Sequence, residues 1–186
     1  MRAFVAVVPP PPALASLVAA VEPLRAAYPA GVTWVPAERL HLTLAFLGEV
    51  TDPVAAALGD GLRLAVARIA PFDVRVAGGG AFPRPERPKV LWAGVAGDVD
   101  ALDRLARVTR GAARDAGVRL ERAPYVPHVT VARIRTAPLD GPAAVAALRR
   151  VEGEPWTVTE AVLVRSVPGP HPSYEPLARC ALGYQA

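Results

Sequence analysis

Two stretches of the sequence share one pattern: "HLTLAFLG" at residues 41–48 and "HVTVARIR" at residues 128–135. Each begins with histidine and continues with an apolar residue, a threonine, a second apolar residue and an alanine. This alternation of polar and apolar positions is typical of a β-strand with one buried face. The chain has only three histidines, so the presence of two of them in one frame argues against coincidence.

The frame places two polar side chains on the same face of each predicted strand. Residues i and i+2 of a strand point to the same side, so His41 lies beside Thr43, and His128 lies beside Thr130. The intervening Leu and Val residues point to the opposite face, which we expect to be buried. Two such pairs that face each other across a cleft would form a compact site of four side chains.

A site of this kind suits acid–base chemistry on a phosphodiester. One imidazole can accept a proton from water, and the other can protonate a leaving oxygen, close to neutral pH. The threonine hydroxyls can hold an anionic group between the rings. No acidic residue lies in either frame, which favours a metal-free site over a zinc site. Structural histidines, or a binding module without catalysis, are the alternatives.

Strands and helices alternate along the rest of the chain. Apolar periodicity and turn residues predict strands at 2–8, 31–35, 40–48, 72–78, 90–95, 128–134, 156–166 and 173–182, and helices at 14–24, 53–69, 99–116 and 142–150. The Gly/Pro-rich segment 78–89 is expected to lack regular structure. It would connect two lobes, residues 1–80 and 89–186, of a single domain 1–186. Short strands without a Gly-rich phosphate loop favour an α+β fold with two similar lobes over a parallel α/β sheet.

The composition is that of a globular protein. The 186 residues are 52% hydrophobic and 20% charged, and the net charge of +4 mildly favours an anionic partner. Residues 3–21 carry no charge, but four consecutive prolines interrupt them, so we expect no membrane segment and a cytoplasmic protein. The single cysteine, Cys180, is expected to be a buried thiol. Trp34 and Trp92 are expected in the core, and His171 on the surface.

The two frames resemble the paired His-x-Thr-x motifs of the 2H phosphoesterases, here "HLTL" (41–44) and "HVTV" (128–131). The chain is most similar to the branch of RNA 2′,3′-cyclic phosphodiesterases, also called 2′-5′ RNA ligases, through "MRAFVAV", "TWVPAERLHLTLAFLGEV", "GGGAFPRPERPKVLWAGV" and "PYVPHVTVAR". The resemblance implies a bilobal fold with antiparallel sheets, flanking helices, pseudo-twofold symmetry and an active-site cleft between the lobes. It also implies metal-independent hydrolysis of a 2′,3′-cyclic phosphate at an RNA end to a 2′-phosphomonoester.

The same resemblance implies roles for individual residues. His41 would donate a proton to the departing 3′ oxygen, and His128 would be the base that activates water, with no cofactor. Arg133 resembles a family arginine and suits a phosphate contact, although position i+5 faces away from His128 unless the strand bulges. Tyr125 could stack on a base. The expected partner is an RNA with a 2′,3′-cyclic phosphate end, bound by a monomer. Reverse ligation is a further expected activity, and hydrolysis of small nucleotide cyclic phosphates is an alternative.

Overall fold

One curled, antiparallel sheet runs through the computed structural model, which describes residues 1–136, 139–169 and 172–183. The strands are β1 (Arg2–Val7), β2 (Val32–Trp34), β3 (Leu42–Glu49), β4 (Phe72–Phe82), β5 (Val90–Gly97), β6 (Val129–Ile134), β7 (Trp156–Val158), β8 (Glu160–Val167) and β9 (Ser173–Ala181). The helices are α1 (Pro11–Ala27), α2 (Asp52–Val66), α3 (Val99–Asp115) and α4 (Gly141–Leu148), with one 3-10 turn at Ala37–Arg39. The predicted α+β class with antiparallel pairing and flanking helices is confirmed.

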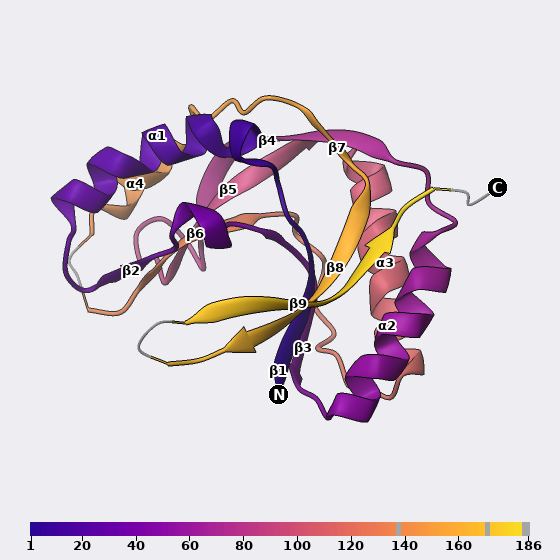
Figure 1. Cartoon of the computed structure of the whole chain (residues 1–186). Coiled ribbons are helices and arrows are strands. Elements are labelled where there is room, and N and C mark those ends of the chain that lie inside the picture. Colours follow the sequence, from indigo (N-terminus) through magenta and orange to yellow (C-terminus); the bar gives the residue numbers. More distant parts are fainter. Residues whose placement is uncertain (137–138, 170–171, 184–186) are drawn as a thin grey trace.

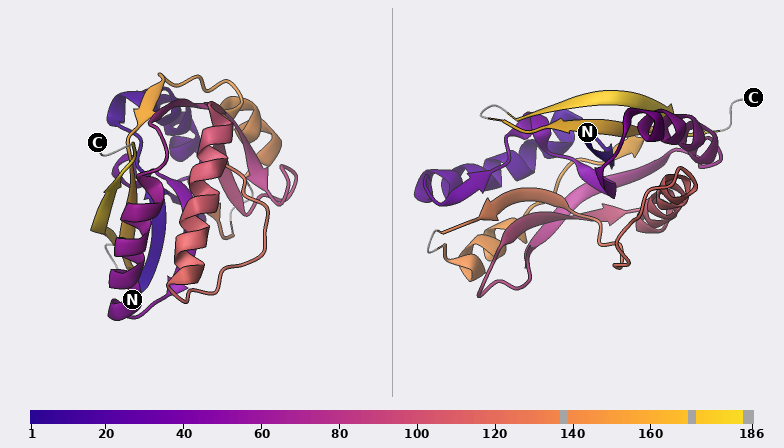
Figure 2. Two further views of the ribbon diagram at one scale, coloured as in Figure 1. Left: turned by 90° about the vertical axis from the view of Figure 1, so that its right-hand side faces the viewer. Right: turned by 90° about the horizontal axis from the view of Figure 1, so that it is seen from below.

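The two strands that follow the paired histidines are neighbours in the middle of the sheet. The strand order is β7-β4-β5-β6-β3-β1-β8-β9, with β2 paired to β6. β8 pairs with β1 from the start of the chain, and β9 pairs with β8, so strand pairing does not follow the expected division into 1–80 and 89–186. Figure 2 shows the sheet curling so that β8–β9 and β4–β5 lie on opposite sides of the molecule. The pseudo-twofold symmetry stays a prediction.

Two pairs of helices cover the sheet. In Figure 1, α1 lies beside α4 on one side of the molecule, and α2 lies beside α3 on the other. The side chains of Thr51, Asp98 and Asp140 cap the N-termini of α2, α3 and α4. Buried residues such as Leu58 and Leu62 of α2 recur at helical spacing, as the periodicity predicts. In the part of the chain that the structure describes, no helix is long and apolar enough to span a bilayer.

The prediction that residues 78–89 lack regular structure is wrong for their first part, because β4 continues to Phe82. Gly78 has a φ of 67° and lies in a bulge of β4. Gly80 has no room for a side chain, because a Cβ there would collide with the ring of Trp92 on β5. These glycines therefore allow a bulged strand and a close ring contact, whereas their composition alone suggests a loop.

The single strand predicted at 156–166 is two strands, β7 and β8, which lie far apart in the sheet order. β7 pairs with β4, whereas β8 pairs with β1. Thr159 separates them, and its backbone carbonyl accepts a hydrogen bond from the amide of Leu182 at 2.8 Å. The apolar pattern runs through this break, so it cannot reveal that the chain changes partner strands.

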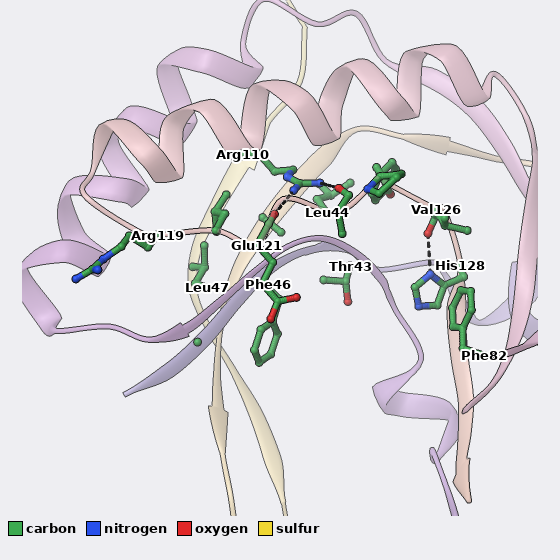
Figure 3. Close-up of a pocket in the computed structure, with 16 residues that line it drawn as sticks. Thr43, Leu44, Phe46, Leu47, Phe82, Arg110, Arg119, Glu121, Val126 and His128 are labelled. Atoms are coloured by element: carbon green, nitrogen blue, oxygen red, sulfur yellow. Dashed lines mark hydrogen bonds between the residues drawn. The ribbon is translucent and has the colours of Figure 1, made fainter. Parts of the chain in front are cut away.

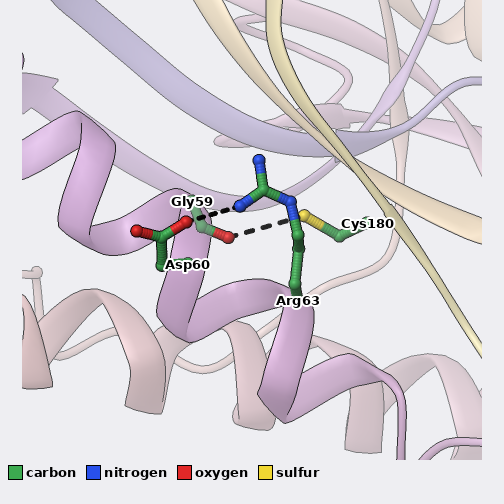
Figure 4. A network of polar contacts seen from close by, with 4 residues as sticks. All are labelled: Gly59, Asp60, Arg63 and Cys180. Carbon is green, nitrogen blue, oxygen red and sulfur yellow. Dashed lines mark hydrogen bonds and ion pairs between the residues drawn. The ribbon is translucent and has the colours of Figure 1, made fainter.

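Cys180 is fully buried on β9, as predicted. Its Sγ atom lies 4.0 Å from the carbonyl oxygen of Gly59 on α2, next to the ion pair of Arg63 with Asp60 (Figure 4). The thiol therefore serves as a small apolar group in the contact between α2 and the sheet.

Candidate active site

The pairing of β3 with β6 brings the predicted site residues to one face of the sheet. Leu42 pairs with Val129, and both side chains are fully buried. In an antiparallel pair, the neighbours of such a contact lie opposite each other and point to the other face. His41 therefore lies across from Thr130, and the same relation holds between the other threonine and the other histidine. All four side chains are partly exposed to the cleft.

A β-bulge follows the threonine in both strands. In β3, the consecutive residues Leu44 and Ala45 are both buried, because the register against β1 shifts there. In β6, Val131 and Ala132 are both buried at a shift of the register against β5. Each bulge interrupts the alternation of faces, so the residue five positions after each histidine returns to the cleft face.

The residues that the bulges bring to the cleft are Phe46 and Arg133. The Phe46 side chain is 54% exposed, and the guanidinium of Arg2 lies 5.1 Å from its ring centre. Arg133 is exposed and lines the same cavity as His41, so the bulge that its predicted role requires is present. The sequence analysis did not predict Phe46 as a site residue. The signal was available, because Phe46 stands five residues after His41, as Arg133 stands five residues after His128.

The backbone holds both imidazoles in the same way. Nδ1 of His41 lies 2.7 Å from the carbonyl oxygen of Arg39, and Nδ1 of His128 lies 2.7 Å from that of Val126. A carbonyl oxygen can only accept, so Nδ1 carries the proton of each neutral ring and Nε2 does not. Each Nε2 can therefore accept a proton and, once protonated, can donate it.

The aromatic surroundings of the two histidines differ. The ring of His41 stacks on Phe4, with centroids 4.7 Å apart and an interplanar angle of 25°. Tyr174 meets His41 edge-on at 5.4 Å. His128 meets Phe82 edge-on at 5.2 Å, with an interplanar angle of 84°. Phe4, Tyr174 and Phe82 were not predicted as site residues, because distant strands bring them to the cleft.

Two cavities open on the cleft face, and both are lined by Thr43 and Phe46. The first, about 520 Å³, lies beside His128 and is mainly apolar. The second, about 490 Å³, lies beside His41 and is lined by two arginines and, among the described residues, by no acidic side chain. Figure 3 shows Thr43 between Phe46 and His128, where the cavities meet.

Burial and positive charge lower the pKa of both histidines. For His41, burial is the main cause, the charges of His128 and Arg133 lower the pKa further, and the hydrogen bond to Arg39 opposes them. For His128, burial is again the main cause, the hydrogen bond to Val126 opposes it, and Arg133 adds to the lowering. An anion bound between the rings would offset these charges and favour a protonated imidazole.

Tyr125 lines the first cavity, but its hydroxyl is buried and has no hydrogen-bond partner among the described residues. Burial, followed by the charge of Asp103, raises the pKa of the phenol, which therefore stays protonated. Arg110 of α3 holds the loop that precedes Tyr125 by donating to the carbonyl oxygens of Glu121 and Ala123 at 2.7 and 3.1 Å (Figure 3). The predicted stacking of Tyr125 on a base stays a prediction.

The remaining sequence predictions concern residues around the site. Trp34 packs against the core, as expected, and its Nε1 donates to the carbonyl of Tyr28 at 3.0 Å. Trp92 is partly buried and lies 6.3 Å from His128, so it belongs to the surroundings of the cleft. His171 lies outside the described residues. Across residues 1–136, 139–169 and 172–183, no group of three or more His, Cys, Asp or Glu could hold a metal ion.

Known proteins are similar to this chain in sequence and in fold. The family model of the 2′-5′ RNA ligase superfamily matches residues 9–170. An RNA 2′,3′-cyclic phosphodiesterase of Aeropyrum pernix is 43% identical over 114 residues, which cover 61% of this chain and 63% of that protein. An RNA 2′,3′-cyclic phosphodiesterase of Thermus thermophilus is 37% identical over 179 residues, which cover 89% of this chain and 82% of that protein.

A solved structure extends this likeness to the fold. The crystal structure of Escherichia coli LigT complexed with 3′-AMP matches with a TM-score of 0.74 and 28% identity, over 97% of both chains. This chain thus spans 63% of the length of the Aeropyrum relative and nearly all of LigT. Because the family model covers most of the chain, the protein belongs to the 2′-5′ RNA ligase superfamily.

Proposed function

We propose that the protein hydrolyses a 2′,3′-cyclic phosphodiester at the end of an RNA to a 2′-phosphomonoester, without a metal ion. The contact of β3 with β6 carries this proposal, because it sets the two His/Thr pairs side by side on one face of the sheet with both Nε2 atoms available for proton transfer. The two relatives described above support the same substrate, since each is named an RNA 2′,3′-cyclic phosphodiesterase.

In the proposed reaction, His128 accepts a proton from water while the water oxygen attacks phosphorus. The bond from phosphorus to the 3′ oxygen breaks, and His41 gives its proton to that oxygen. The 2′ oxygen keeps the phosphoryl group, which yields the 2′-phosphomonoester. Each proton transfer is worth about 10²- to 10⁴-fold in rate. The assignment of donor and acceptor follows the family resemblance, because the backbone holds both rings alike.

The anionic phosphate would lie between the two rings. The hydroxyls of Thr43 and Thr130 can donate to its non-bridging oxygens, and both side chains line the cavity beside His41. Arg133 lines the same cavity and can add a charge-assisted hydrogen bond. Together these donors would stabilise the charge that builds up on the non-bridging oxygens in the transition state.

The mainly apolar first cavity would hold the group that attacks phosphorus. It lies beside His128, the proposed base, and its volume of about 520 Å³ exceeds what one water needs. A 5′-hydroxyl of a second nucleic-acid end could enter there in place of water, which would give the reverse ligation. Tyr125 and Phe46 line this cavity and offer ring surface to a base.

The test is a short RNA that ends in a 2′,3′-cyclic phosphate, incubated with the protein in EDTA, followed by identification of the product phosphate. We expect a 2′-phosphate from the wild type and its loss in His41→Ala and His128→Ala. A 3′-phosphate, or inhibition by EDTA, would contradict the proposed chemistry. Turnover of nucleoside cyclic phosphates alone would point to small substrates, and binding without turnover would point to a non-catalytic module.

A further inference from the structure

Two arginines line the cavity beside His41 from different strands. Arg133 lies on its β6 side, and Arg2 lines it from β1. Ser166 of β8 pairs with Arg2 in the register and lines the same cavity. With a volume of about 490 Å³, the cavity is in the size range of small-ligand sites.

Arg2 has no carboxylate partner in the part of the chain that the structure describes. It takes part in no ion pair among the described residues, and its guanidinium rests on the ring of Phe46. Glu49, its register partner on β3, lies 3.7 Å from the amino terminus instead. By contrast, Arg165 on the opposite face of β8 pairs with Glu175 at 3.8 Å. The unpaired arginine is the one that faces the cavity.

The position of Arg2 along β1 relates it to the proposed reaction. Phe4, on which His41 stacks, lies two residues farther along the same face of β1, a step of about 7 Å. In the proposed reaction His41 protonates the 3′ oxygen, so the terminal ribose lies on this side of the phosphate. The 5′ oxygen of that ribose carries the next phosphate of an RNA.

We propose that Arg2 and Ser166 form a subsite for a second phosphate group, carried on the 5′ oxygen of the terminal nucleotide. This inference rests on the proposed function. Arg2 would supply the charge and Ser166 a hydroxyl donor. The ring of Phe46 would hold the guanidinium of Arg2 in place through their cation–π contact. The subsite makes the enzyme select nucleotides with a 5′-phosphate, as found within an RNA chain, over nucleosides that carry only the cyclic phosphate.

The test compares kcat/KM for three substrates: a nucleoside 2′,3′-cyclic phosphate, its 5′-phosphorylated form, and a dinucleotide that ends in the same cyclic nucleotide. We expect the wild type to prefer both substrates with the second phosphate by about tenfold, the scale of a charge-assisted hydrogen bond. Arg2→Ala should abolish this preference, and Arg2→Lys should retain part of it. The preference should weaken in high salt.

Arg165→Ala is the matched control, because it removes an arginine of the same neighbourhood from the opposite face. It should keep the wild-type ratio. An equal loss of turnover for all three substrates in Arg2→Ala would refute the subsite and assign Arg2 to the structure of the cleft. A gain for the dinucleotide alone would also refute it, because the contact would then be to the added nucleoside. If the wild type turned over none of the substrates, the proposed function would fail and the subsite with it.

Discussion

On the β3 side of the cleft, His41 stacks on Phe4, and the residue that the bulge brings to the cleft is Phe46. On the β6 side, His128 makes T-shaped contacts with Phe82 and Trp92 and stacks on neither, and the bulge brings Arg133 to the cleft. The backbone is the same on both sides: a histidine that donates to the carbonyl two residues earlier, a threonine, and a bulge at an alanine.

The two sides of the cleft share their backbone features and differ in the side chains around them. The shared backbone gives two rings able to exchange protons, and by itself it treats them as equivalent. The side chains around them differ, so an asymmetric substrate can bind in one orientation, with an arginine on one side and an apolar ring on the other. In the proposed reaction, the surroundings of the two histidines, and not the motif, would therefore distinguish the acid from the base.

The largest expected effect is the loss of kcat in the two histidine variants, and a change of leaving group should distinguish their roles. We expect His41→Ala and His128→Ala each to lower kcat on an all-oxygen cyclic phosphate by about 10²- to 10⁴-fold. If the 3′ bridging oxygen is replaced by sulfur, the leaving group needs no proton. Turnover of this substrate should then recover in His41→Ala only. Recovery in His128→Ala instead would exchange the two roles.

The next largest effects are expected at the two residues that the bulges bring to the cleft. Arg133→Ala should lower kcat/KM by about ten- to a hundredfold, because a charged partner of the phosphate is lost. Its charge also lowers the pKa of both histidines, so both limbs of the pH profile should move to higher pH in this variant. Phe46→Ala should mainly raise KM and leave the limbs in place. Equal effects of the two variants would show that the sides are not specialised.

A stability measurement tests the support behind His128. Gly80→Ala would push its methyl group into Trp92, whose ring lies 5.2 Å from Phe82. We expect the free energy of unfolding to fall by about 1–3 kcal/mol, measured by urea denaturation. Gly61→Ala on α2 is the control, since nothing lies within 4 Å of its Cβ; it should be neutral or stabilising. A neutral Gly80→Ala would mean that the ring can move aside.

The smallest expected effect is a shift of either the acid or the alkaline limb in the pH profile of kcat/KM. Because burial lowers the pKa of both histidines, the maximum of kcat/KM should lie below about pH 6.5. Activity falls above it as His41 loses its proton, and below it as His128 gains one. Phe4→Leu should raise the pKa of His41 and move only the alkaline limb upward. Phe82→Leu should move only the acid limb upward; the opposite pattern would again reverse the roles.

The sequence by itself determined the two His/Thr pairs and most of the local structure around them. The repeated frame identified two strands, their buried faces and the His/Thr pairs, because side-chain alternation is a local property of a strand. The starts of α2 and α3 were predicted to within one residue, and Cys180 was predicted to be buried, since helix starts and apolar content depend on near neighbours.

Only the tertiary structure decided which strands meet. The pairing of Leu42 with Val129, which joins residues far apart in the chain, turns two separate motifs into one site. The same holds for the split of 156–166 between distant strands and for Gly80 of β4, whose role depends on Trp92 across the sheet. Arg2 and Phe46 gain their place in the cleft from bulges and strand order. Such features depend on partners that no local pattern encodes, because pairing and register are set by the packing of the whole sheet.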